Sequence, residues 1–172
     1  MFRLTGWKYS IPVEILSKCV ICVAPHTSNW DFVIGLIFYK SIGGDPHILM
    51  KKSWFVFPIN YLLKAMGAVP VDRTKRTSLT DQMKTEFESR SHFQLAIAPE
   101  GTRKENPVWK SGFYYIALAA RVPITLAYLD YAKKTVGAIE NFIPTGNAKE
   151  DIEKIKQKYK DITGRKPAQF AI

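Results

Sequence analysis

Short apolar runs alternate along the chain with segments in which apolar residues recur every three or four positions. Short apolar runs bounded by turn residues predict strands, and a spacing of three or four predicts helices. The helix that begins at Ser78 is the clearest, because Leu79, Met83 and Phe87 share one face. The predicted strands are residues 18–24, 47–51, 68–72, 93–98, 124–129 and 135–140; the predicted helices are 28–39, 54–66, 78 onwards, 112–121 and 149–162.

Strands that alternate with helices indicate an α/β fold with a central sheet covered by helices on both faces. The two strands nearest the C-terminus are close enough to form an antiparallel hairpin, so the sheet is predicted to be mixed and mostly parallel. Neither a repeat of fixed period nor a low-complexity linker divides the 172 residues. We therefore expect a single domain over residues 1–172.

The longest apolar stretches, residues 19–25 and 113–120, are far shorter than the roughly 20 residues that cross a bilayer. The first ten residues lack a continuous apolar segment with a small-residue cleavage site, so we expect no signal peptide. Two cysteines, Cys19 and Cys22, make no disulfide framework and are expected to lie in the core. The expected compartment is the cytoplasm.

The chain carries 25 Lys and Arg against 15 Asp and Glu, a formal net charge of +10 that is spread over both halves. Such a surface suits an anionic partner: a nucleic acid, a phospholipid surface or a phosphorylated substrate. Charge alone does not choose among them.

The turn after the first predicted strand contains a histidine and a carboxylate. His26 lies in the turn, and Ser28 is a candidate N-cap that places Asp31 in the first turn of the helix. Helical side chains lean toward the N-terminus, so the Asp31 carboxylate is predicted to face His26 and to leave one imidazole nitrogen free as a general base. The alternative is that Asp31 only caps the helix. The segment alone does not decide between them.

A second turn, Pro99-Glu100-Gly101-Thr102-Arg103, also follows a predicted strand. Gly101 permits a positive φ, and Arg103 offers a planar fork of donors, so the turn suits a phosphate monoester. The alternative is a surface pair between Glu100 and Arg103. Arg73 belongs to a third, cationic cluster that follows the strand predicted at 68–72.

Together these segments resemble the four sequence blocks of the glycerolipid (lysophosphatidic acid type) acyltransferase family, in order and in rough spacing. Each block is short, but four in register are specific, and the resemblance covers most of the chain. The blocks are His26 and Asp31 in an HX4D pattern, residues 67–73, residues 99–103 and residues 122–124.

This resemblance implies a glycerol-3-phosphate acyltransferase-like fold and a role in phospholipid biosynthesis. His26 would be the base that takes the proton of the acceptor hydroxyl, and Asp31 would orient it. Lys51 would stabilise the developing oxyanion or hold a phosphate. The residues that would bind the glycerol phosphate are Arg73, Glu100, Gly101, Thr102 and Arg103.

The implied reaction moves a fatty acyl group from acyl-CoA or acyl carrier protein to the hydroxyl of a lysophospholipid such as 1-acylglycerol 3-phosphate. No metal and no cofactor is expected. The chain departs from the family pattern at Pro25, Pro70 and Leu126. It resembles a short bacterial branch, without the extended N-terminal pair of membrane-anchoring helices.

Contact with lipid is expected at an anionic membrane surface, on the cytoplasmic face and without a spanning helix. Aromatic residues favour the bilayer interface and cations favour anionic lipids; the alternative is that these aromatics pack in the core. The two mixed clusters are Phe2, Arg3, Trp7, Lys8 and Tyr9, and Lys51, Lys52, Trp54, Phe55 and Phe57.

Two other functions stay open at the level of sequence. One is an acyltransferase for a different hydroxyl- or amine-bearing lipid. The other is a non-enzymatic module that binds an anionic ligand or nucleic acid, which the charge permits, although no nucleic-acid-binding signature accompanies it and no nucleic acid partner is expected.

Overall fold

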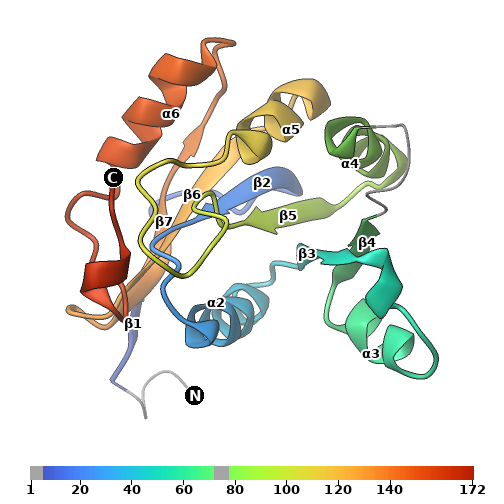
Figure 1. Ribbon diagram of the computed structural model, residues 1–172, viewed down its shortest axis with the longest axis horizontal. Coiled ribbons are helices and arrows are strands. Elements are labelled where there is room, and N and C mark those ends of the chain that lie inside the picture. The colour runs from blue at the N-terminus through green and yellow to red at the C-terminus, as the bar shows by residue number, and fades with distance from the viewer. Residues whose placement is uncertain (1–5, 72–77) are drawn as a thin grey trace.

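The computed structural model describes residues 6–71 and 78–172, which form one seven-stranded sheet (Figure 1). The strand order is β1-β7-β6-β2-β5-β3-β4. The strands are β1 (Lys8–Ser10), β2 (Lys18–Val23), β3 (Pro46–Lys51), β4 (Ala68–Val71), β5 (Phe93–Ile97), β6 (Ile124–Asp130) and β7 (Thr135–Phe142).

All neighbouring strands are parallel except β6 and β7, which form the predicted antiparallel hairpin. The mixed, mostly parallel α/β fold is therefore confirmed. All six predicted strands are present within one or two residues at each end, apart from Asp72, which lies outside the described residues. The sequence analysis missed β1, because three exposed residues carry no apolar pattern.

Helices cover both faces of the sheet: α2 and α3 lie on one side, and α4, α5 and α6 on the other (Figure 1). The chain moves toward β4 through α2 and α3 and returns toward β6 through α4 and α5, so crossovers in opposite directions use opposite faces, as a single handedness for all of them requires. The helices are α2 (Asn29–Ser41), α3 (Ile59–Ala65), α4 (Leu79–Ser89), α5 (Gly112–Ala120) and α6 (Ala148–Gln157), with short 3-10 helices η1 (Lys52–Trp54) and η2 (Pro167–Gln169).

The alternation of side chains along β2 divides the apolar interior into two cores. Val20 and Cys22 point to the side of α4, α5 and α6, while Cys19 and Ile21 point to the side of α2. Both cysteines are free, as expected of core residues. A strand that is buried on both faces consists of a continuous run of apolar residues, which is why the sequence predicted β2.

Two predicted helices differ from the structure. The segment 54–66 is not one helix: η1 ends at Trp54 and α3 begins only after Pro58, because a residue that precedes proline is disfavoured in the helical region. The last helix ends at Gln157 rather than 162, yet Ile162 still packs against the larger core from the turns that follow.

The carboxyl ends of β2, β3, β4, β5 and β6 meet at one edge of the sheet, because these five strands run parallel. In open α/β sheets this edge is where ligands bind. No helix in the described part of the chain is long and apolar enough to span a bilayer.

Candidate active site

His26 lies in the turn that joins β2 to α2, and this turn is built around one buried carboxylate. Ser28 caps the helix: its hydroxyl accepts from the N–H of Trp30 over 3.2 Å. The backbone N–H groups of Thr27 and Ser28 donate to Oδ2 of Asp31 over 2.8 and 2.7 Å. Asp31 is 1% exposed. The predicted cap and the predicted direction of the carboxylate are both confirmed.

The imidazole of His26 faces the same carboxylate. Nδ1 lies 3.5 Å from Oδ2 of Asp31, within ion-pair range and longer than a formed charge-assisted hydrogen bond. The His26 side chain is 24% exposed. With Nδ1 facing the acid, Nε2 is the nitrogen left to exchange a proton. Asp31 therefore faces the imidazole as well as capping the helix.

Tyr131 completes the surroundings of Asp31, and the sequence analysis missed it. Its hydroxyl donates to Oδ1 of Asp31 over 2.7 Å, while its own backbone N–H donates to the carbonyl of Thr163. The ring packs edge-on against Trp7 at 5.1 Å between centroids. Tyr131 directly follows β6, which is a parallel neighbour of β2. Its place after a strand was therefore the only feature of the sequence that could have indicated a site residue.

The donors around Asp31 decide its charge. Burial alone would raise the pKa of this carboxyl, but His26, the Tyr131 hydroxyl and two backbone amides together hold the pKa below its ordinary value. Burial and the neighbouring carboxylate raise the pKa of the Tyr131 phenol, so it stays a neutral donor. These donors together keep the Asp31 carboxyl ionised at neutral pH.

Glu100 approaches the same turn from the loop after β5. Its Oε1 accepts from the backbone N–H of His26 over 2.9 Å, and the residue is 1% exposed. Its Oε2 has no hydrogen-bond partner among the described residues. Burial raises the pKa of this carboxyl, opposed by the contacts with His26. Glu100 is thus buried in contact with the turn that holds His26 and does not form the surface pair with Arg103.

The rest of this loop turns back toward α2. Gly101 has a φ of 65°, and a β-carbon there would lie 2.6 Å from Cε of Lys110, so glycine is required unless Lys110 moves. Thr102 accepts from the N–H of Lys104. The exposed guanidinium of Arg103 donates to the side chain of Asn29, the first residue of α2. Arg103 therefore lies beside the turn that holds His26.

Lys51 is not part of this cluster. The register aligns Ile21, Ala96 and Ile48 across β2, β5 and β3, which places Lys51 at the same edge, two strand spacings or roughly 10 Å to one side. No described hydrogen bond or ion pair joins Lys51 to the cluster. Arg73 lies outside the described residues.

The C-terminal segment packs over the histidine turn, which local patterns did not reveal. The N–H of Lys166 donates to Oγ1 of Thr27 over 3.2 Å, and a β-carbon on Gly164 would lie 3.0 Å from Thr27. With its amide reoriented, Gln169 donates to the carbonyls of Arg103 and Thr27. The segment thus ties the two functional loops together.

The remaining sequence signals lie elsewhere. Residues 122–124 are at the amino end of β6, where Pro123 accepts from Val20, so this block contributes packing at the opposite edge. His47 sits beside Arg90 and Phe93. Among the described residues, no group of three His, Cys, Asp or Glu could hold a metal ion.

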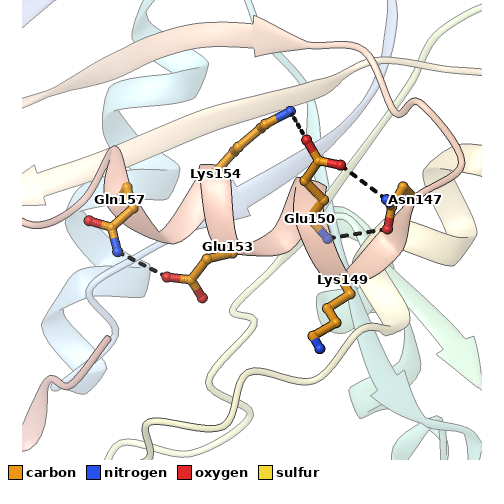
Figure 2. A pocket seen from close by; sticks show the side chains of 6 residues that line it. All are labelled: Asn147, Lys149, Glu150, Glu153, Lys154 and Gln157. Carbon is orange, nitrogen blue, oxygen red and sulfur yellow. Dashed lines mark hydrogen bonds and ion pairs between the residues drawn. The ribbon is translucent and has the colours of Figure 1, made fainter.

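A pocket on α6 does not belong to the site. Most of its side chains pair with one another (Figure 2). Lys154 lies 2.6 Å from Glu150, and Gln157 lies 2.9 Å from Glu153. Asn147 caps the same helix. Because α6 covers the face of the sheet opposite α2 (Figure 1), these groups are not available to His26.

Comparison with protein families finds one match. The model of a family described as Acyltransferase matches residues 9–128, which run from β1 into β6. No curated protein matches the chain. The match includes His26, Asp31 and the loop 99–103, while Tyr131 and the C-terminal segment lie beyond it.

Proposed function

The chain belongs to the acyltransferase family, and from that premise we propose that it transfers a fatty acyl group from a thioester, acyl-CoA or acyl carrier protein, to the hydroxyl of a lysophospholipid such as 1-acylglycerol 3-phosphate. The observation that carries the proposal is the pair formed by His26 and buried Asp31, placed at the carboxyl edge of parallel strands beside the Glu100–Arg103 loop.

His26 acts as the general base. Nε2 takes the proton of the acceptor hydroxyl as its oxygen bonds to the thioester carbonyl carbon; the carbon–sulfur bond then breaks, and the imidazolium returns the proton to the leaving thiolate. Asp31 holds the ring by Nδ1 and stabilises the imidazolium. A positioned base of this kind contributes about 10²–10⁴-fold to the rate. Direct transfer needs no acyl-enzyme, only alignment of the two substrates.

The acceptor phosphate binds at Arg103, with Thr102 and the turn at Gly101. Arg103 is exposed and lies beside the start of α2, where a guanidinium can make two parallel hydrogen bonds to a phosphate. Its hydrogen bond to Asn29 holds the guanidinium in place before the acceptor binds. Glu100 fixes the backbone of His26 and keeps one buried oxygen for an acceptor hydroxyl.

Lys51 binds an anionic part of the substrates that lies further along the edge, and Arg73 contributes to binding of the glycerol phosphate. At roughly two strand spacings from β2, Lys51 is better placed for a phosphate than for the oxyanion. The enzyme works on lipid at the cytoplasmic face of an anionic membrane, where the net charge of +10 favours binding.

A thiol-release assay with a panel of acceptors tests the proposal. Purified protein is incubated with acyl-CoA or acyl carrier protein thioester and with lysophosphatidic acid, lysophosphatidylcholine, glycerol 3-phosphate or a lipid amine. We expect the fastest thiol release with lysophosphatidic acid. Release that is equal with and without any acceptor would indicate a thioesterase and contradict the proposal.

The acceptor site is tested with a pair of matched variants in the same loop. Arg103→Ala is expected to raise the KM for the phosphate acceptor roughly tenfold or more with a smaller change in kcat, since it removes a charge-assisted contact. Lys104→Ala, the exposed neighbouring cation, is expected to change KM by less than about twofold. Equal effects of the two variants would mean that Arg103 acts only through general charge.

A further inference from the structure

The segment between β3 and β4 exposes apolar side chains more than the rest of the described chain. Neither η1 nor α3 contains a buried residue, whereas α2, α4, α5 and α6 each bury two or more. Of the fifteen large apolar residues that are exposed in the described chain, six fall within residues 54–62. We call these six the α3 platform: Trp54, Val56, Phe57, Ile59, Tyr61 and Leu62.

The exposure of the platform is large. Phe57 is 81% exposed, and its ring meets only that of Tyr61 in the described aromatic contacts, edge-on at 6.3 Å. Scattered single exposed apolar residues are normal on a protein, but a contiguous group marks a surface that binds another apolar body. We therefore expect the α3 platform to bind another apolar body.

Charge around the platform identifies that occupant. Residues 46–71 contain Lys51, Lys52 and Lys64 and not one Asp or Glu. The surface of α6 is the opposite case, since acidic and basic side chains alternate there and pair with one another. Exposed aromatics flanked only by cations match the interface of an anionic bilayer, where rings sit among the headgroups and lysines reach the phosphates.

The platform also has a functional position. It starts where β3 ends, at the same carboxyl edge that holds His26 and Glu100, and α3 lies on the same side of the sheet as α2 (Figure 1). On α2, Trp30 and Val33 are exposed as well. A bilayer that meets this side would lie next to the turn that holds His26.

We propose that the α3 platform is the membrane-docking surface of the protein and that it sets Phe57 and Trp54 into the headgroup layer of an anionic bilayer. The docked enzyme then takes its lysophospholipid from the bilayer across the carboxyl edge of the sheet; this last step rests on the function proposed above. The surface could instead bind an acidic carrier protein or a second copy of the chain, and the experiment below distinguishes both from a bilayer.

Binding is measured by sedimentation of the full chain with vesicles of phosphatidylcholine containing phosphatidylglycerol, and with vesicles of phosphatidylcholine alone. Trp54→Ser with Phe57→Ser is expected to lower the partition coefficient at least about tenfold. Lys52→Gln with Lys64→Gln is expected to lower it by roughly fivefold for each lysine at low salt and to leave binding to neutral vesicles unchanged.

The matched control carries Tyr115→Ser with Ile143→Ser, an exposed aromatic and an exposed aliphatic residue away from the platform. This control should sediment like the wild type. The proposal is overturned if the wild type does not sediment with anionic vesicles, or if the platform variant and the control sediment equally. It is overturned too if size-exclusion chromatography shows a dimer that only the platform variant breaks, or if acyl carrier protein binds in place of vesicles.

Activity on two forms of the acceptor separates this proposal from the proposed function. With a short-chain lysophosphatidic acid below its micellar concentration, the platform variant should keep wild-type turnover; with the acceptor in vesicles its turnover should fall with its binding. Equal loss on the monomeric acceptor would place the platform in the acyl site instead. Vesicle binding without turnover by the wild type would remove the proposed function and leave the docking surface standing.

Discussion

Asp31 and Glu100 are two buried carboxyl groups that contact the same histidine, and they differ in the donors that surround them. Asp31 accepts from two backbone amides and from the Tyr131 hydroxyl, besides facing the His26 ring. Glu100 accepts one described hydrogen bond, from the backbone of His26, and one of its oxygens has no partner. Their pKa values shift in opposite directions as a result.

The difference shows that burial does not set the charge of a carboxyl group by itself. Desolvation raises both pKa values, and only the group with enough donors overcomes it. Asp31 is thereby suited to be a permanent anion that orients the base. Glu100 is suited to a site where a bound acceptor supplies the missing hydrogen bond.

The largest effect is expected for Asp31→Asn. The amide removes the anion that orients and stabilises the imidazolium, and kcat should fall by about 10²–10⁴-fold. The backbone N–H groups of Thr27 and Ser28 also lose their shared charged acceptor, so the free energy of unfolding should fall by about 1–3 kcal/mol. Thiol-release kinetics and urea unfolding measure the two effects. Wild-type kcat in this variant would remove Asp31 from catalysis.

Glu100→Gln is the matched change on the other carboxyl and should behave differently. The amide oxygen still accepts from His26, and the cost of ionising a buried acid disappears, so stability at pH 7 should be unchanged or higher. Acceptor binding should weaken, with a KM raised about tenfold, because the oxygen kept for the acceptor is changed. A destabilisation as large as that of Asp31→Asn would show that the two carboxyls are equivalent in the fold.

Tyr131→Phe removes one donor from Asp31 while the ring remains. Two tyrosines offer a comparison, because Tyr159 also uses its hydroxyl in the core, donating to the carbonyls of Cys22 and Ala127. Both Phe variants should lose about 1 kcal/mol of stability. Only Tyr131→Phe should lower kcat, by roughly three- to tenfold. Identical kinetics in the two variants would make Tyr131 a purely structural residue.

The smallest effect is in the pH dependence of stability. The pKa of Asp31 is lowered on folding, so it contributes stability above its unfolded pKa of about 3.9, and that stability is lost as pH falls through the folded pKa. The pKa of Glu100 is raised, so its contribution is present below about pH 4.3 and is lost as pH rises through the folded pKa.

Urea unfolding between pH 3 and pH 7 separates the two contributions. Relative to the wild type, Asp31→Asn should lose more stability at pH 7 than at pH 3, and Glu100→Gln should gain more at pH 7 than at pH 3. Parallel profiles for both variants would contradict the opposite shifts.

Local patterns predicted most of the sheet and the turn in which Asp31 faces His26. The β-branched run of β2, the Ser28 cap and the direction of Asp31 follow from neighbouring residues, which is why they could be read from the sequence. The helix predicted over 54–66 was wrong because proline disfavours a helical conformation in the residue before it, so α3 begins only after Pro58. Three exposed residues gave no signal for β1.

The missed parts of the site depend on contacts between distant segments. Tyr131 reaches Asp31 across one hundred positions of sequence, and Lys166 reaches Thr27 across 139. Such contacts depend on the order of strands in the sheet, which no local spacing encodes. The same reason explains Lys51, whose place at the end of a strand was predicted correctly but whose distance from His26 depends on β5 lying between β2 and β3.

His26 contacts both carboxyls, and its replacement decides whether it acts as the base. Thiol release from an acyl thioester is followed with lysophosphatidic acid for the wild type and for His26→Ala, with urea unfolding to show that both are folded. The predicted result is a fall of at least about 10²-fold in kcat, with product acylation lost in parallel. Equal rates for the two folded proteins would contradict it.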